Sequence, residues 1–316
     1  MYLAIPACFL GGVMIWFGAT ILVSGATGLA EKFGISEAII GLTIVALGTS
    51  LPELAVAIEA VRTDSPDIAI GGVLGSNVAN VMLVLGAAAL FGAKSQTGDA
   101  VKRDSLAVVV ATAFMAFFVI MGEIPMIGGI VMLVSLSGYY LYTYSKAISG
   151  EDVYEFEDSW LSEKISVAIP ACLVGGLMIW FGAELLVSGS KGIADTFGVS
   201  EAVIGLTIVA LGTSLPELAV TLVAGLRGQG GVAVGNVLGS NVMNIMGIIG
   251  IASIVGNGII VDSVFTRDIA VVVVTSGFVV GVFLSGKDFS KTMGSLMIII
   301  YLTYMTYLAG LLDGLV

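Results

Sequence analysis

Long apolar segments follow one another along the whole chain, separated by short clusters of polar, glycine and proline residues. A helix needs about 20 mostly apolar residues to cross a hydrocarbon core of about 30 Å. The segments that meet this requirement are 3–24, 37–60, 69–92, 104–121, 126–145, 166–189, 200–225, 233–256, 268–285 and 290–312. The pattern therefore predicts an all-α integral membrane protein with ten transmembrane helices.

The second half of the chain repeats the first. The string IGLTIVALGTSLPELAV occurs unchanged at Ile40 to Val56 and again at Ile204 to Val220, an offset of 164 residues. We divide the chain into a first repeat at 1–145, a linker at 146–165 and a second repeat at 166–316. Each repeat holds five predicted spans, and because five is odd, the second repeat enters the membrane from the opposite side. The sequence predicts two inverted five-helix repeats, which many secondary transporters use to alternate access.

Lysine and arginine residues predict the orientation, because cytoplasmic loops collect them. With the N-terminus outside, only Arg62, Lys191 and Arg267 lie outside. The cytoplasmic set is Lys32, Lys94, Lys102, Arg103, Lys146, Lys164, Arg227, Lys287 and Lys291. This bias predicts a multi-pass plasma-membrane protein with both termini extracellular and the linker in the cytoplasm.

Composition narrows the function. The chain is 58% hydrophobic, has a mean hydropathy of +1.09 and carries a net charge of −11, which argues against nucleic-acid binding. It contains no histidine, so histidine-based zinc hydrolases, catalytic triads and proton relays are excluded. We expect no enzyme activity, no cofactor and no obligatory protein partner besides the lipid bilayer. The acidic segment 151–163 is interpreted as a solvated linker, with a cation-gathering or regulatory role left open.

The repeated motif Gly-Thr-Ser-Leu-Pro-Glu places polar groups inside an apolar span. Pro52 and Pro216 lack a backbone N–H, so each leaves the carbonyl four residues earlier without its helical partner and tends to kink the helix. Such carbonyls are tolerated in a membrane only inside protein or beside a wet cavity. Thr49 and Glu53 are four residues apart, which predicts one shared helix face, and their copies are Thr213 and Glu217.

A second motif lies in the following span of each half. Ser76 and Asn80 are again four residues apart, and Ser240 and Asn244 repeat them. Neighbouring glycines permit close backbone approach, although glycines at helix contacts in membranes are often there for packing alone. The two motifs together offer hydroxyl, amide, carbonyl and carboxylate oxygens, which hard cations such as Ca²⁺ and Na⁺ prefer.

The two glutamates are energetically costly. An ionisable residue at the bilayer centre costs about 2.5 to 3.5 kcal/mol on insertion scales. Two carboxylates about 5 Å apart would repel by roughly 3 kcal/mol at an effective dielectric near 20. No basic residue lies in these spans to neutralise Glu53 and Glu217. We therefore expect mobile cations to pair with them, and exchange rather than leak, because only the loaded carrier would cross readily.

These paired motifs resemble the two alpha-repeats of the cation/calcium exchanger superfamily, and most closely its prokaryotic sodium/calcium exchanger branch. The resemblance implies a compact bundle with four core helices around the ions and two long tilted helices that slide across it. It also implies that Glu53 and Glu217 bind Ca²⁺ and share the Na⁺ sites. The further donors that it implies are Thr49, Ser50, Thr213, Ser214, Ala46, Ala210, Ser76, Ser240, Asn80 and Asn244.

The chain departs from some relatives in one place. Archaeal and potassium-dependent members carry Asp where this chain has Asn244, so one potential charge is absent and K⁺ co-transport is disfavoured. The function expected is a secondary antiporter that exchanges Ca²⁺ for Na⁺, with Ca²⁺ extrusion driven by inward Na⁺. A proton/calcium antiporter is the nearest alternative, and a cation channel is a more distant one. Glu184 matches Thr20 in the first half and is expected near the mouth of a pathway or in a local hydrogen bond.

Overall fold

The computed structural model describes residues 4–92, 99–148, 164–196 and 210–308, and these residues are almost entirely helical. The elements are α1 Ala4–Phe33, α2 Glu37–Ile40, η1 Gly41–Val45, α3 Ala46–Thr49, α4 Leu51–Arg62, α5 Pro66–Ala79, η2 Asn80–Val84, α6 Leu85–Leu90, α7 Asp99–Met121, β1 Glu123–Ile124, α8 Met126–Ile148, α9 Ile165–Thr196, α11 Ala210–Thr213, α12 Leu215–Leu226, α13 Gly230–Val242, η4 Met243–Ile249, α14 Gly250–Val255, β2 Ile259–Ile260, α15 Phe265–Leu284 and α16 Lys291–Leu308. The elements marked η are π-helical segments.

Seven of the described helical segments are long and apolar enough to cross a membrane, and the bent pair Ala38–Thr49 with Leu51–Arg62 makes an eighth. This confirms a mostly helical membrane protein. The two further spans of the sequence prediction correspond to the helix α16 and to a span whose first part, 200–209, lies outside the described residues. The linker segment 151–163 lies outside them as well.

The longest helices, α1 and α9, extend beyond the predicted spans 3–24 and 166–189. They continue to Phe33 and Thr196, which gives them 30 and 32 residues. At 1.5 Å per residue such a helix is about 45 Å long, and so it crosses a core of about 30 Å only when tilted or with its ends outside. The sequence located the apolar part, but a helix need not end where its apolar part ends.

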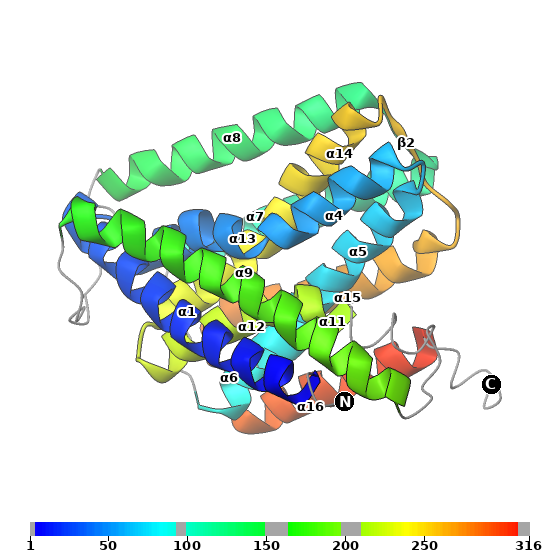
Figure 1. The fold of residues 1–316 in the computed structure, drawn as a ribbon. Coiled ribbons are helices and arrows are strands. Elements are labelled where there is room, and N and C mark those ends of the chain that lie inside the picture. The colour runs from blue at the N-terminus through cyan, green and yellow to red at the C-terminus, as the bar shows by residue number, and fades with distance from the viewer. Residues whose placement is uncertain (1–3, 93–98, 149–163, 197–209, 309–316) are drawn as a thin grey trace.

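Helices α1 and α9 lie side by side and antiparallel across the front of the bundle (Figure 1). A Cβ atom added to Gly11 would lie 2.6 Å from the carbonyl oxygen of Gly182. One added to Gly25 would lie 2.8 Å from the carbonyl oxygen of Ala168. Residue numbers therefore rise along α1 as they fall along α9, which is antiparallel packing. Glycine is required at these contacts because any side chain would push the two backbones apart.

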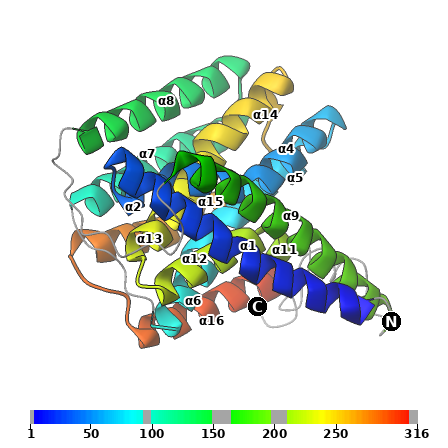
Figure 2. The ribbon, with the colours of Figure 1, turned by 60° about the vertical axis from the view of Figure 1, so that its left-hand side comes forward.

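The third predicted span of each half lies in the interior of the bundle. Every residue of α13 is buried, and residues 66–90 and 230–255 are the most deeply buried spans. By contrast α1, α8 and α9 carry large exposed apolar side chains, such as Phe9, Leu141 and Leu173. Figure 2 shows α8 at the periphery and α13 within the bundle. Exposed apolar faces on outer helices are what a lipid-facing surface requires.

One short pair of strands joins two distant connections. β1 and β2 are antiparallel, with Glu123 opposite Ile260 and Ile124 opposite Ile259. The connection after α7 and the connection after α14 are therefore hydrogen-bonded to each other. They must lie at the same face of the membrane, which constrains how many times the intervening chain crosses it.

Candidate cation-binding site

Both copies of the proline motif break a helix in the middle of the protein. Helix α3 ends at Thr49, Ser50 leaves the helical conformation, and α4 begins at Leu51 with a bend of 46°. Pro52 falls in the first turn of α4, where its missing N–H costs no hydrogen bond. The second copy does the same at Ser214. The break follows from the proline, although the chain leaves the helix at the serine that precedes it by two residues.

This break corrects one prediction of the sequence analysis. Thr49 and Glu53 do not share the face of one helix, because Thr49 ends α3 and Glu53 lies in the first turn of α4. Glu217 likewise lies in the first turn of α12. The first turn of a helix carries partial positive charge and free N–H groups, so it stabilises a carboxylate there. Two helix N-termini each carry one glutamate in the protein interior.

Hydrogen bonds from one half reach groups of the other. The Ser50 hydroxyl donates to Oε1 of Glu217 over 3.2 Å. The Thr49 hydroxyl lies 3.2 Å from Oδ1 of Asn236 and 3.5 Å from the Ser240 hydroxyl. All five side chains are buried. The two repeats therefore build one shared cluster rather than two separate sites.

Several oxygens of this cluster have no partner among the described residues. Buried groups without a hydrogen bond include both carboxylate oxygens of Glu53, Oε2 of Glu217 and the Ser214 hydroxyl. The amide oxygen and the amide nitrogen of Asn80 and of Asn244 are also buried without a hydrogen bond. The two carboxylates repel each other, and neither forms an ion pair with a described lysine or arginine. A buried polar group without a partner costs free energy, and a buried charge costs more. Such a set of oxygens is suited to hold a cation.

A small cavity adjoins Glu53. It measures about 30 Å³ and is lined by residues that include Glu53, Ser76 and Thr213. This is enough for a particle the size of a water molecule. Thr213 comes from the second half of the chain, and Ser76 from the span that follows the Glu53 helix. The site offers two carboxylates, Glu53 and Glu217, and no group of three histidine, cysteine or acidic side chains that could hold a metal ion occurs within the described residues.

The remaining predicted donors lie in several different helical segments, and one of them already accepts a hydrogen bond. The carbonyl oxygen of Ala46 already accepts a hydrogen bond from the Ser50 backbone N–H and lies 3.2 Å from the Thr49 hydroxyl. Ala210 is the first residue of α11. Asn80 begins the π-helical segment η2, and Asn244 lies in η4. π-Helical segments are rare and occur often at functional sites. The helical pattern of the sequence gave no sign of them.

Asn236 is the polar residue that the sequence analysis missed. Its amide oxygen accepts from Thr49, and its amide nitrogen donates to the Thr221 hydroxyl over 3.0 Å and to the Glu217 carbonyl oxygen over 3.3 Å. The residue is fully buried. The offset of 164 pairs Asn236 with Gly72. A search for polar positions present in both halves therefore passed over it, although an asparagine within an apolar span was itself a usable signal.

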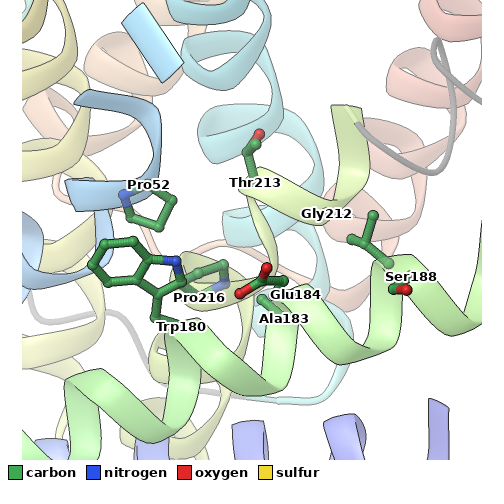
Figure 3. A pocket seen from close by; sticks show the side chains of 9 residues that line it. Pro52, Trp180, Ala183, Glu184, Ser188, Gly212, Thr213 and Pro216 are labelled. Carbon is green, nitrogen blue, oxygen red and sulfur yellow. The ribbon is translucent and has the colours of Figure 1, made fainter. Parts of the chain in front are cut away.

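Glu184 lies apart from the two central glutamates. It lines a second and wider cavity of about 360 Å³, together with Pro52, Pro216 and Thr213 (Figure 3). Its side chain extends from α9 toward the α11–α12 break. That it lies near the mouth of a pathway stays a prediction of the sequence analysis.

A comparison with known protein families shows the family to which the chain belongs. The family described as "Sodium/calcium exchanger protein" matches the chain twice, at residues 3–145 and 167–310. The chain belongs to this family. Each half matches once, in agreement with the internal duplication read from the sequence.

Similar proteins and structures of this family cover most of the chain. The putative antiporter CaxA of Alkalimonas amylolytica is 34% identical over 277 residues, 85% of this chain and 86% of the relative. The sodium/calcium exchanger MaX1 of Methanosarcina acetivorans is 31% identical and covers 78% of this chain and 81% of its own. A solved structure of the sodium-calcium exchanger NCX_Mj superposes with a TM-score of 0.82 at 30% identity, over 96% of this chain and 98% of the other. The fold of this family member is therefore that of the exchangers.

Proposed function

We propose that the protein is a secondary antiporter that exchanges Ca²⁺ for Na⁺ across the membrane by alternating access. The observation that carries this proposal is the meeting, in a cluster of oxygen donors, of two buried glutamates from the two halves that have no ion-pair partner among the described residues. Membership of the exchanger family and the similarity to sodium/calcium exchangers support the choice of ions.

We assign the carboxylates of Glu53 and Glu217 as the central ligands of Ca²⁺. The donors around them are proposed to be Thr49, Ser50, Thr213, Ser214, Ser76, Ser240, Asn80 and Asn244, with the carbonyl groups of Ala46 and Ala210 as further donors. Among these, Glu53, Ser76 and Thr213 share a cavity, which supports a cation position there. Oxygen-only donors favour Ca²⁺ and Na⁺ over softer metals.

Charge balance links the two ions. Two carboxylates without a basic partner among the described residues leave an empty carrier with two negative charges in a poorly solvated place. One Ca²⁺, or an equivalent load of Na⁺ or H⁺, would offset that charge. Movement of the empty carrier would be slow and movement of the loaded carrier fast, which produces exchange instead of leak.

We also propose ten spans in two inverted repeats, divided at 1–145 and 166–316, with both termini outside. The antiparallel packing of α1 against its repeat equivalent α9 supports the inversion. The pairing of β1 with β2 supports the number, because two connections on one membrane face need an even number of crossings between them. Four spans lie between them in the ten-span arrangement. The excess of lysine and arginine in the predicted cytoplasmic loops supports the orientation.

Uptake of radiolabelled Ca²⁺ into sealed proteoliposomes tests the function. We expect uptake when Na⁺ is high inside and low outside, and none when the Na⁺ gradient is absent. Glu53→Gln and Glu217→Gln should abolish this uptake. Glu59→Gln is the matched control, since Glu59 is exposed and lies on the same helix as Glu53.

Three outcomes would contradict the proposal. Uptake driven by a pH gradient and indifferent to Na⁺ would identify a proton/calcium antiporter. Ca²⁺ flux that needs no counter-ion and carries a large electrical current would identify a channel. Exchange that persists in both Gln variants would show that the ions bind elsewhere.

A further inference from the structure

Glu184 lines a cavity, and the residue related to it in the other half of the chain is not an acid. The offset of 164 relates Glu184 to Thr20 and Ser188 to Ser24. Glu184 and Ser188 are exposed, and Glu184 lines the cavity of about 360 Å³. No hydrogen bond or ion pair joins Glu184 to another residue in the part of the chain that the structure describes. A free carboxylate therefore faces this cavity from a membrane-spanning helix.

In the first half, an arginine contacts the residues related to Glu184 and Ser188, which are Thr20 and Ser24. Ser24 is buried and donates to the Thr20 carbonyl oxygen over 2.8 Å. The guanidinium of Arg227, at the end of α12, donates to the Ser24 hydroxyl over 3.0 Å and to the Thr20 carbonyl oxygen over 3.4 Å. One side of the protein thus presents an acid to a cavity, whereas the related side holds a cationic side chain against α1.

The cavity leads toward the central glutamates. Thr213 lines both this cavity and the smaller one that contains Glu53 and Ser76. Pro52 and Pro216, each one residue before a central glutamate, also line the wider cavity (Figure 3). Thr213 is thus shared by the cavity that Glu184 lines and the cavity that Glu53 lines. Glu53 itself has two buried oxygens without a partner, which an arriving cation would satisfy.

The cavity belongs to the side on which α1 begins. In the antiparallel α1–α9 pair, Gly189 packs against Ala4 and Cys8, whereas Ala168 packs against Gly25. Glu184 is therefore close to the N-terminal end of α1, and Thr20 is on the other side of the midpoint of the pair. In the proposed orientation the Glu184 cavity lies on the outer side of the protein and Arg227 on the inner side.

We propose that Glu184 is a recruitment site for the divalent cation on the outer side, with the Ser188 hydroxyl beside it, occupied before the ion passes Thr213 to reach Glu53. This inference rests on the proposed function and adds a sidedness to it. A carboxylate at the mouth of a low-dielectric cavity raises the local concentration of cations, and a divalent ion responds more strongly than a monovalent one. The related position in the first half, Thr20, carries no acid.

Transport measured from each side tests the proposal. In membrane vesicles of defined orientation, Glu184→Gln should raise the external Ca²⁺ concentration for half-maximal exchange about tenfold. The maximal rate and the internal half-maximal concentration should not change. Glu184→Asp should retain most of the external affinity for Ca²⁺. Asp67→Asn is the matched control, because Asp67 is an exposed acid outside the cavity. Raising ionic strength with an inert salt should shrink the difference between Glu184→Gln and the unmodified protein.

An equal change from both faces, or none from either, would overturn the recruitment site. A second measurement does not depend on transport. In a background with Cys8→Ala and Cys172→Ala, Ser188→Cys should react faster with a positively charged thiol reagent than with a negatively charged one, and Ca²⁺ should slow that reaction. Adding Glu184→Gln should remove both effects, and their persistence would refute the proposal.

The two measurements separate this inference from the proposed function. If the unmodified protein exchanges no Ca²⁺ but the Ser188→Cys reaction responds to Ca²⁺ through Glu184, the proposed exchange fails and the recruitment site stands. If exchange occurs without any effect of Glu184, only the recruitment site fails.

Discussion

Replacing Glu217 by Gln should stabilise the metal-free protein while destroying its response to Ca²⁺. Most substitutions of a buried residue destabilise a protein. Glu217 is 1% exposed, is repelled by Glu53 and has one oxygen without a partner. Gln keeps the shape of the side chain and an oxygen that can accept from the Ser50 hydroxyl. The substitution therefore removes the charge and retains the contact.

The magnitude follows from two opposing contributions. For two carboxylates about 5 Å apart at an effective dielectric near 20, removing one relieves roughly 3 kcal/mol of repulsion. The hydrogen bond from Ser50 weakens by about 1 kcal/mol when its acceptor is no longer charged. The net effect is about 2 kcal/mol in favour of the Gln variant without metal. For the unmodified protein, Ca²⁺ at about 100 times its dissociation constant adds about 2.7 kcal/mol.

Thermal unfolding in detergent, with chelator or with saturating Ca²⁺ at alkaline pH, measures both effects. In chelator the Glu217→Gln variant should unfold a few degrees above the unmodified protein. In Ca²⁺ the order should reverse, because only the unmodified protein is stabilised. Glu59→Gln, which alters an exposed acid, should leave both values unchanged. A Gln variant that is less stable in chelator, or that Ca²⁺ stabilises as much as the unmodified protein, would refute the reasoning.

Three further experiments test the packing, the bridge between the halves and the topology. Gly18→Ala should destabilise the protein by about 1 to 3 kcal/mol in thermal unfolding, because its Cβ would lie 2.8 Å from a backbone oxygen of α9; Gly12→Ala, with open space around it, should not. Asn236→Ala should cost about 1 to 3 kcal/mol and weaken Ca²⁺ binding measured by calorimetry, because buried partners lose their hydrogen bonds; unchanged binding would remove it from the site. In intact cells a membrane-impermeant thiol reagent should label Glu123→Cys and spare Lys287→Cys, and the opposite result would reverse the orientation.

Sequence reasoning reached far in this protein because the duplication supplied an internal comparison. Polar residues that occur in both halves of an apolar chain are unlikely to be accidental, and this led to Glu53, Glu217 and their neighbours. The same reliance on symmetry explains why Asn236 was missed, since Gly72 stands at its related position. Helix ends were also misjudged, because α1 and α9 continue past their apolar segments.

The amino-acid sequence by itself determined that the protein lies in a membrane, that it is duplicated, and which residues are too polar to be buried there without a purpose. These conclusions depend on local composition and on spacing, which a linear chain displays directly. Only the tertiary structure decided that Ser50 of one half donates to Glu217 of the other, that Thr49 and Glu53 belong to different helices, and that Glu184 lines a cavity. Contacts between residues more than 160 positions apart depend on how the helices pack, and no local pattern specifies that.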